Sequence, residues 1–189
     1  SDIKLLIPDT KEAGFGIVPT TSTSVQLSIG DALAIAVMEH KKFNHLDFKK
    51  FHPAGNLGNK LKTAEDLMLT KQKIPFINEN DTIKKGLKII NSKKLGVLVA
   101  RNKSLNTTGI FTDGDIKRTI QKNNNLKRQK IKSYMTKNPI SINKDVLAAN
   151  ALGLMNEKKI TTLCVHKDNN KKRTLGVLHI HTLLNADIS

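Results

Sequence analysis

The chain has 189 residues, a length between one and two ordinary domains, and 38% of them are hydrophobic. Its mean hydropathy is -0.33 and no apolar run approaches the roughly 20 residues that span a bilayer, which excludes a membrane protein and argues against a disordered one. No basic-then-apolar leader opens the chain, and a single cysteine, Cys164, allows no internal disulfide. We therefore expect a cytoplasmic protein.

The net charge of +16, from 32 basic and 16 acidic side chains, raises the question of a nucleic-acid partner. Only four of the basic residues are arginines, there is no tryptophan and one tyrosine, and the lysines are spread over the whole chain. Base and phosphate readout favours arginine, and single-strand binding favours aromatic platforms. The composition therefore indicates lysine-rich solvated surfaces, compatible with phosphorylated small ligands, and we expect no nucleic-acid partner.

Residues 1–62 are predicted to hold one β-α step. The segment from Lys4 to Ile7 alternates as a strand does, and the hydroxyls of Pro19–Thr23 are expected to cap a helix that carries Val25, Ile29, Leu33 and Val37. One strand with one or two helices cannot bury its own faces, so this segment is expected to be the end of an α/β domain. Because the chain also begins with Ser1, we expect a piece of a longer protein.

The remainder of the chain is an internal repeat, which we place at 63–125 and 126–189. Three landmarks recur in the same order at an offset of 65 to 67 residues: Glu65–Met68 as Lys132–Met135, Lys93–Val99 as Lys158–Val165, and Gly109–Thr112 as Gly176–His179. Each repeat is predicted to run β-α-β-β-α, with Asp81 or Asp145 capping its first helix. Since about 60 residues form a marginal domain alone, the two repeats are expected to pack together.

The segment Gly109–Asp115 resembles the signature of CBS domains, the cystathionine-β-synthase-type repeats that occur in pairs and hold nucleotides between them. The hydroxyl of Thr112 can bond a phosphate, and Asp115 can accept bonds from ribose hydroxyls, with Asp113 beside them. The alternative is that Thr112 and Asp115 merely cap the helix that begins near Asp113.

The second repeat departs from this signature. In Gly176–Thr182, His179 stands where the hydroxyl is expected and Thr182 stands where the acid is expected. His179 and His181 share one face if the segment is extended, which raises the question of a metal pair. No third ligand is visible in the sequence, so we predict polar contacts of His179, His181 and Thr182 to a phosphate or sugar, and no metal.

A second resemblance covers the whole chain. Pro19–Thr23, Gly30–Ala34 and Phe51–Gly58, followed by two CBS units, are similar to the C-terminal part of the D-arabinose-5-phosphate isomerases. In that family a sugar isomerase (SIS) domain of flavodoxin-like α/β type precedes a CBS pair. Ala54 replaces a glycine of the family pattern, and Thr182 replaces an aspartate, a change expected to alter the choice of ligand.

The resemblance implies that the parent protein interconverts ribulose 5-phosphate and arabinose 5-phosphate, a precursor step for 3-deoxy-octulosonate and lipopolysaccharide. His52 matches the active-site histidine of the family, and the alternative is a surface histidine in a linker. The other catalytic groups of the family lie upstream, so this chain alone is predicted to be inactive. No cofactor is required, and a homo-oligomer, dimer or tetramer, is expected.

Three functions remain open from the sequence. The first is a regulatory module that binds an adenine nucleotide (AMP or ATP) or, by the logic of the pathway, CMP-activated 3-deoxy-octulosonate. The second is a CBS scaffold that binds nothing and serves oligomerisation. The third is a basic nucleic-acid binder, whose affinity would fall steeply with salt.

Overall fold

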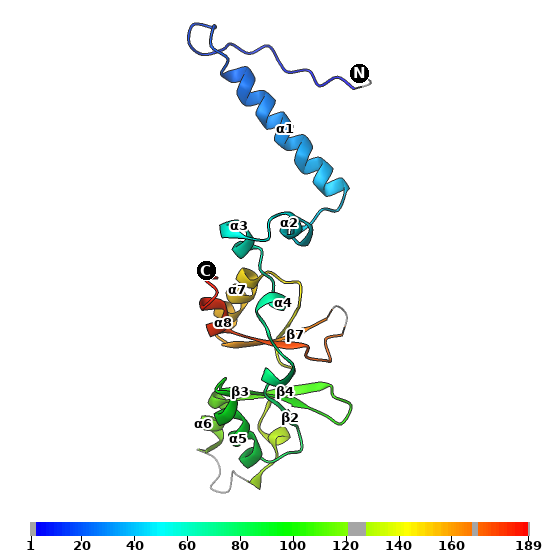
Figure 1. Ribbon diagram of the computed structural model, residues 1–189, viewed down its shortest axis with the longest axis vertical. Helices are drawn as coiled ribbons and strands as arrows, with labels where there is room; N and C mark the ends of the chain where they lie inside the picture. The colour runs from blue at the N-terminus through cyan, green and yellow to red at the C-terminus, as the bar shows by residue number, and fades with distance from the viewer. Residues whose placement is uncertain (1–2, 121–127, 168–169, 189) are drawn as a thin grey trace. The chain divides into compact units, whose positions relative to one another are not determined.

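The computed structural model describes residues 3–120, 128–167 and 170–188, and it divides into two compact units, Ser1–Phe51 and His52–Ser189 (Figure 1). The domain limits expected at 62/63 and 125/126 stay predictions, and the second of them lies outside the described residues. No helix in the described ranges is long and apolar enough to cross a membrane.

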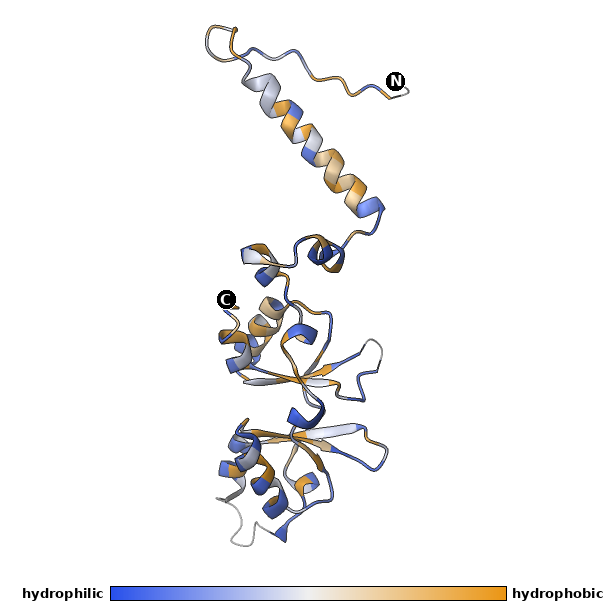
Figure 2. Ribbon diagram, viewed as in Figure 1, coloured by the Kyte–Doolittle hydropathy of each residue, from blue (hydrophilic) through white to orange (hydrophobic). Residues whose placement is uncertain are grey.

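The first unit contains α1 (Thr21–His40) and α2 (His45–Phe51). None of its described residues is buried, and Figure 2 shows apolar residues along α1. The strand expected at Lys4–Ile7 is wrong, because these residues have no regular structure. A strand needs a neighbour for its backbone N–H and C=O groups, and the described part of this unit contains no other strand.

The N-terminus of α1 is capped by a carboxylate rather than by the expected hydroxyls. Thr20, the N-cap residue, makes no side-chain cap bond. Instead Glu12 accepts hydrogen bonds from the backbone N–H groups of Thr20 (2.8 Å), Thr21 (2.7 Å) and Ser22 (3.1 Å). Bonds from Ser22 and Thr20, led by the Ser22 side chain, lower the pKa of Glu12 to about 2. Glu12 is therefore an ionised helix cap at neutral pH.

The second unit begins with α3 (Gly55–Lys60) and α4 (Ala64–Leu67) and then contains the two repeats. The first repeat holds β1 (Leu69–Thr70), η1 (Lys71–Lys73), β2 (Phe76–Asn78), α5 (Ile83–Lys93), β3 (Val97–Arg101), β4 (Thr107–Thr112) and α6 (Asp113–Ile120). The second holds η3 (Ile131–Ser133), β5 (Thr136–Lys137), β6 (Ser141–Asn143), α7 (Ala148–Lys158), β7 (Thr162–His166), β8 (Gly176–His179) and α8 (Ile180–Leu184). The predicted β-α-β-β-α order is confirmed in both, and each repeat adds one two-residue strand.

The predicted helix caps Asp81 and Asp145 are wrong. The N-cap of α5 is Thr82, whose hydroxyl accepts from the Lys85 N–H, and the N-cap of α7 is Leu147. Asp81 instead accepts from the Asn78 N–H, closing the turn after β2. Aspartate favours both caps and such turns, so the residue type alone does not place the first helical residue.

Each repeat completes the sheet of the other. One sheet has the order β2-β3-β4-β5 and the other has the order β1-β8-β7-β6. Thus β5 of the second repeat pairs antiparallel with β4 of the first, and β1 of the first pairs antiparallel with β8 of the second. The helices that precede these strands, α4 and η3, are exchanged as well. The N–H of Ala64, at the start of α4, donates to the Val146 carbonyl, and the N–H of Ile131, at the start of η3, donates to the Asp81 carbonyl.

Three apolar clusters hold this unit together. In each repeat the helices cover one face of a sheet and form an apolar core with it. Ala64 of α4 is buried in the core of the second repeat, and Ile131 of η3 is buried in the core of the first. The third cluster, Ile74, Val99, Cys164 and Val177, lies between the two sheets. The sheets therefore face one another, with α5 and α6 on one outer side and α7 and α8 on the other (Figure 1).

The exchange explains two landmarks of the sequence repeat. A Cβ atom added to Gly109 would lie 2.8 Å from Sδ of Met135, and one added to Gly176 would lie 2.7 Å from Cγ of Met68. The methionine of each repeat therefore packs on the strand glycine of the other. A larger residue at Gly109 would collide with the backbone of β5, and one at Gly176 would collide with the Met68 side chain.

Candidate ligand-binding cleft

A cleft of about 580 Å³ lies between the two repeats. Its walls are the turns Lys94–Gly96 and Lys159–Thr162, the start of α6, and the histidines where β8 meets α8. Lys94 and Lys159 end α5 and α7 in the left-handed conformation, with φ of 55° and 53°, so the two turns are equivalent features of the two repeats. The volume falls in the range of about 300–1,000 Å³ usual for small-molecule sites.

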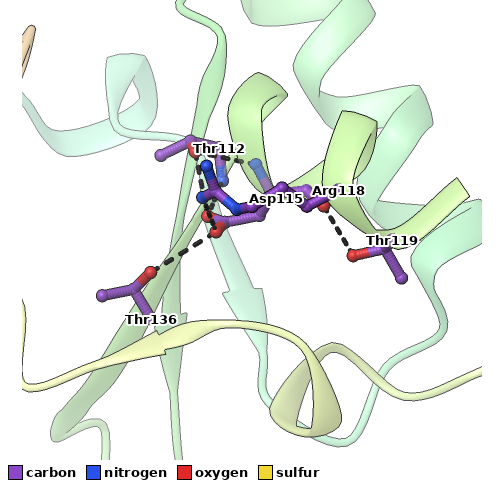
Figure 3. Close-up of polar contacts among 5 residues, drawn as sticks. All are labelled: Thr112, Asp115, Arg118, Thr119 and Thr136. Carbon is purple, nitrogen blue, oxygen red and sulfur yellow. Dashed lines mark hydrogen bonds and ion pairs between the residues drawn. The ribbon is translucent and has the colours of Figure 1, made fainter. Parts of the chain in front are cut away.

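The signature of the first repeat forms a hydrogen-bonded network at the edge of this cleft (Figure 3). Oδ2 of Asp115 accepts from the Thr112 N–H (2.8 Å) and from the Thr112 hydroxyl (2.9 Å). Oδ1 accepts from the Arg118 guanidinium (2.5 Å) and more weakly from the Thr136 hydroxyl (3.4 Å). Since Thr136 lies on the exchanged strand β5, the network also joins the two repeats.

The local geometry includes the capping arrangement weighed from the sequence. The Asp115 N–H donates back to the Thr112 hydroxyl (3.3 Å), so the two residues cap α6 reciprocally. The same Thr-x-x-Asp pattern recurs before α4, where Asp66 accepts from the N–H and hydroxyl of Thr63. Asp115 is 5% exposed and does not line the cleft, whereas Thr112 does.

Asp113, the third residue predicted in this segment, lines the cleft beside a glycine turn. A Cβ atom on Gly96, whose φ is +63°, would lie 2.7 Å from Oδ2 of Asp113. The Asp113 N–H donates to the Gly96 carbonyl (3.0 Å). Gly96 therefore leaves room for the Asp113 carboxylate against the turn, and the bond of the Asp113 N–H holds its backbone at the cleft wall.

In the second repeat the cleft contains His179 and His181 but not Thr182. The Nδ1 atom of His179 accepts from the His181 N–H (3.3 Å), and the two ring centroids are 5.1 Å apart. His179 ends β8 and His181 lies in α8, so they are not on one extended face as considered from the sequence. Burial, and then the charge of His181, lowers the pKa of His179, which keeps its imidazole neutral at pH 7.

Three basic residues of the cleft were missed by sequence reasoning: Lys94, Arg118 and Lys159. Asp113 is the one carboxylate among the lining residues, so the cleft favours an anionic ligand. Thr136 also lines it and comes from a strand of only two residues. Lys94 and Lys159 occupy equivalent positions in the two repeats, directly after α5 and α7, and this equivalence could have identified both lysines from the sequence.

The predicted catalytic residue His52 lies apart from this set. It follows the end of α2, is exposed, and is not among the residues that line the cleft. A Cβ atom on Gly58 would lie 3.1 Å from the carbonyl oxygen of His52 and 2.8 Å from the carbonyl carbon of Pro53. The backbone at His52 is thus packed tightly against α3. Within the described ranges no group of three or more His, Cys, Asp or Glu side chains could hold a metal ion.

Comparison with curated proteins shows similarity along the whole chain. Arabinose 5-phosphate isomerase KdsD of Salmonella typhimurium is 37% identical over 190 residues, covering 100% of this chain and 57% of that protein. The KdsD protein of Escherichia coli K12 is 35% identical with the same coverage, and an uncharacterized protein of Rickettsia prowazekii is 37% identical over 58% of its length. The chain thus spans a little over half the length of these relatives, and the resemblance to arabinose-5-phosphate isomerases is confirmed.

Solved structures of CBS pairs share the fold of the second unit. CBSX2 in complex with AMP superposes with a TM-score of 0.56 and 19% identity, over 66% of this chain and 95% of that one. The CBS pair of protein MJ0100 in complex with 5′-methylthioadenosine and S-adenosylmethionine gives a TM-score of 0.58 and 20% identity, over 66% and 94%. The family model of the CBS domain matches residues 64–122 and 131–189. With these two matches covering more than half of its residues, the chain belongs to the CBS-domain family.

Proposed function

We propose that the chain is the regulatory part of an arabinose 5-phosphate isomerase and that its CBS pair binds a nucleotide or nucleotide-sugar effector. The observation that carries this proposal is the cleft between the repeats, which Lys94, Arg118 and Lys159 line together with Thr112 and the two histidines. The adenosine ligands of CBSX2 and MJ0100 support it by analogy of fold. The two candidate classes are an adenine nucleotide (AMP or ATP) and CMP-activated 3-deoxy-octulosonate.

The ligand contacts are proposed as follows. Thr112, Asp113, His179 and His181 line the cleft and touch the ligand directly. Asp115 and Thr182 do not line the cleft, and their proposed role is to hold the neighbouring residues that do. The neutral imidazole of His179 suits a hydrogen bond to a sugar or phosphate oxygen better than an ion pair.

A thermal-shift panel with AMP, ATP, CMP and CMP-activated 3-deoxy-octulosonate tests this function. A ligand at 100 times its Kd stabilises the folded state by about 2.7 kcal/mol. For a chain of this size that corresponds to a rise in Tm of roughly 5–10 °C. We expect such a rise with at least one of the four compounds. If none of them shifts the Tm, the binding function is wrong and the non-binding scaffold, which our proposal displaces, is supported.

The isomerase activity is proposed for a longer parent protein, because the chain spans 57% of the KdsD relatives. We propose that His52 opens the sugar ring or shuttles protons there, as an imidazole that acts as general acid and base can. The 189-residue chain alone is expected to show no turnover of arabinose 5-phosphate above a buffer control. Turnover that disappears in the His52→Ala variant would contradict this expectation, since it would place a complete active site in this chain. The cytoplasmic location and the dimeric or tetrameric assembly stay predictions.

A further inference from the structure

A second cavity, of about 280 Å³, lies at the opposite end of β3 from the cleft. The cleft contains Gly96, which precedes β3, whereas this cavity contains Arg101, the last residue of β3, and Asn102. Its walls come from β2, the turn after β2, α5 and the loop after β3, all within the first repeat. The two sites share no lining residue, so the second cavity can be considered by itself.

Arg101 is a partly buried cation without an acceptor among the described residues. Its Cζ atom lies 3.0 Å from the centroid of the Phe76 ring, so the ring covers one face of the guanidinium. Within the described ranges its side chain makes no hydrogen bond and no ion pair. Burial lowers the pKa of Arg101, but a guanidinium stays ionised at neutral pH. Its N–H donors are therefore left for a ligand.

The two asparagines of the cavity are oriented as donors. Oδ1 of Asn78 accepts from the Asn80 N–H (2.9 Å), and Oδ1 of Asn102 accepts from the Asn106 N–H (3.0 Å). Since a backbone N–H can only donate, these bonds decide which end of each amide is the oxygen. Neither Nδ2 group has a partner in the part of the chain that the structure describes. Three side chains of the cavity thus offer N–H donors.

The one carboxylate among the lining residues is already engaged. Oδ2 of Asp81 accepts from Nζ of Lys85 (2.8 Å) and from the Asn78 N–H (3.3 Å). This ion pair compensates the charge of Lys85, so Arg101 gives the cavity one net positive charge. The rest of the wall is apolar and consists of Phe76, Ile77, Ile89 and Leu105. One uncompensated cation with several donors and an apolar wall is complementary to a single carboxylate on an apolar body.

Leu105 is an unusual residue for its place in this wall. Its φ is 62°, and its side chain is 55% exposed. The left-handed region is costly for a residue with a bulky side chain, and asparagine or glycine usually occupies it. Neither burial nor backbone conformation therefore accounts for a leucine here, whereas contact with an apolar ligand does.

We propose that the second cavity binds a small organic monocarboxylate with an apolar body. The Arg101 guanidinium binds the carboxylate, the side-chain amides of Asn78 and Asn102 donate to it, and the apolar body lies against the apolar wall. This site is separate from the cleft and does not depend on the proposed effector.

Titration of the full, isotope-labelled chain with four compounds, followed by NMR, tests the proposal. The compounds are benzoate, its neutral counterpart benzamide, acetate, which lacks the apolar body, and inorganic phosphate, whose double charge exceeds that of the single free cation. We expect benzoate to shift the backbone amide signals of Asn78, Arg101 and Asn102 in a saturable way. Each of the other three compounds is expected to bind at least about tenfold more weakly.

Variants assign the role of each group. Arg101→Gln is expected to weaken benzoate by about tenfold or more, and Arg101→Lys by about threefold or more, because lysine keeps the charge and loses the planar fork. The matched control Lys103→Gln removes the same charge from an exposed residue outside the cavity, and it is expected to change binding by less than about twofold. Leu105→Asn is expected to weaken benzoate without lowering the Tm, since asparagine tolerates the left-handed conformation.

Several results would overturn the proposal. They are the absence of a saturable shift at the cavity with benzoate, binding of benzamide or phosphate as tight as that of benzoate, and unchanged binding by Arg101→Gln. A thermal melt shows whether each variant is folded. If Arg101→Gln does not fold, the comparison of Arg101→Lys with Lys103→Gln decides, and equal binding by these two would overturn the proposal. None of these results bears on the cleft, where a nucleotide is followed at the signals of Gly96 and Thr112.

Discussion

The Gly109→Ala variant is expected to lower the free energy of unfolding by about 1–3 kcal/mol, the usual cost of overpacking. The new Cβ atom would lie 2.6 Å from the carbonyl oxygen of Thr136 and 2.8 Å from Sδ of Met135. The oxygen belongs to the backbone of β5, which is held in place by its pairing of Lys137 with Gly109 and of Thr136 with Ile110. The exchanged strand would have to move away from β4, and the cleft residue Thr136 would move with it.

Urea denaturation monitored by circular dichroism measures this loss, and Gly153→Ala is its matched control. Gly153 lies on the exposed side of α7, and a Cβ atom there would meet nothing within 4 Å. The control is expected to raise the free energy of unfolding by about 0.5–1 kcal/mol, because alanine is the better helix former. The same substitution therefore has opposite signs at the two sites. A neutral or stabilising Gly109→Ala would show that β5 does not close over Gly109.

The architecture of each repeat could be predicted from the sequence because its elements are periodic. Ile83, Leu87 and Ile90 keep helical spacing and all pack on the sheet of the first repeat. The exchange of β1 and β5 could not be predicted in this way, since two residues are too few to alternate. The pairing partners of β1 and β5 lie far along the chain. The sequence therefore shows that Met68 recurs as Met135, but it does not show that each methionine packs on the strand glycine of the other repeat.

The candidate site was predictable in part for a similar reason. Thr112 and Asp113 were found because they lie in a recognisable segment at a strand-to-helix turn. Lys94, Arg118 and Lys159 were missed because 32 basic residues are spread over the chain, so that a basic side chain by itself does not mark a site. Only the equivalent positions of Lys94 and Lys159 after corresponding helices could have identified those two. Asp115 and Arg118 are three residues apart on α6, so helical spacing allows their ion pair to be predicted, whereas the burial of the Asp115 side chain could not be predicted from the sequence.

The second glycine of the exchange predicts a different response to a compensating change. Gly176→Ala is expected to destabilise the chain by about 1–3 kcal/mol, because the new Cβ atom would lie 2.7 Å from Cγ of Met68 and 3.0 Å from its Cβ. The three atoms nearest to this position, Sδ, Cγ and Cβ, all belong to the Met68 side chain. Truncation by Met68→Ala removes most of the clash, although it also removes packing from the core of the second repeat.

A double-mutant cycle measures the difference between the two glycines. The Gly176→Ala and Met68→Ala pair should be less destabilised than the sum of the single variants, with a coupling of about 1 kcal/mol or more. The Gly109→Ala and Met135→Ala pair should couple more weakly, because the Thr136 carbonyl oxygen remains 2.6 Å from the new Cβ atom when Met135 is shortened. Equal coupling at both pairs would mean that β5 yields as easily as a side chain, and that the backbone of the exchanged strand does not hold the two repeats together.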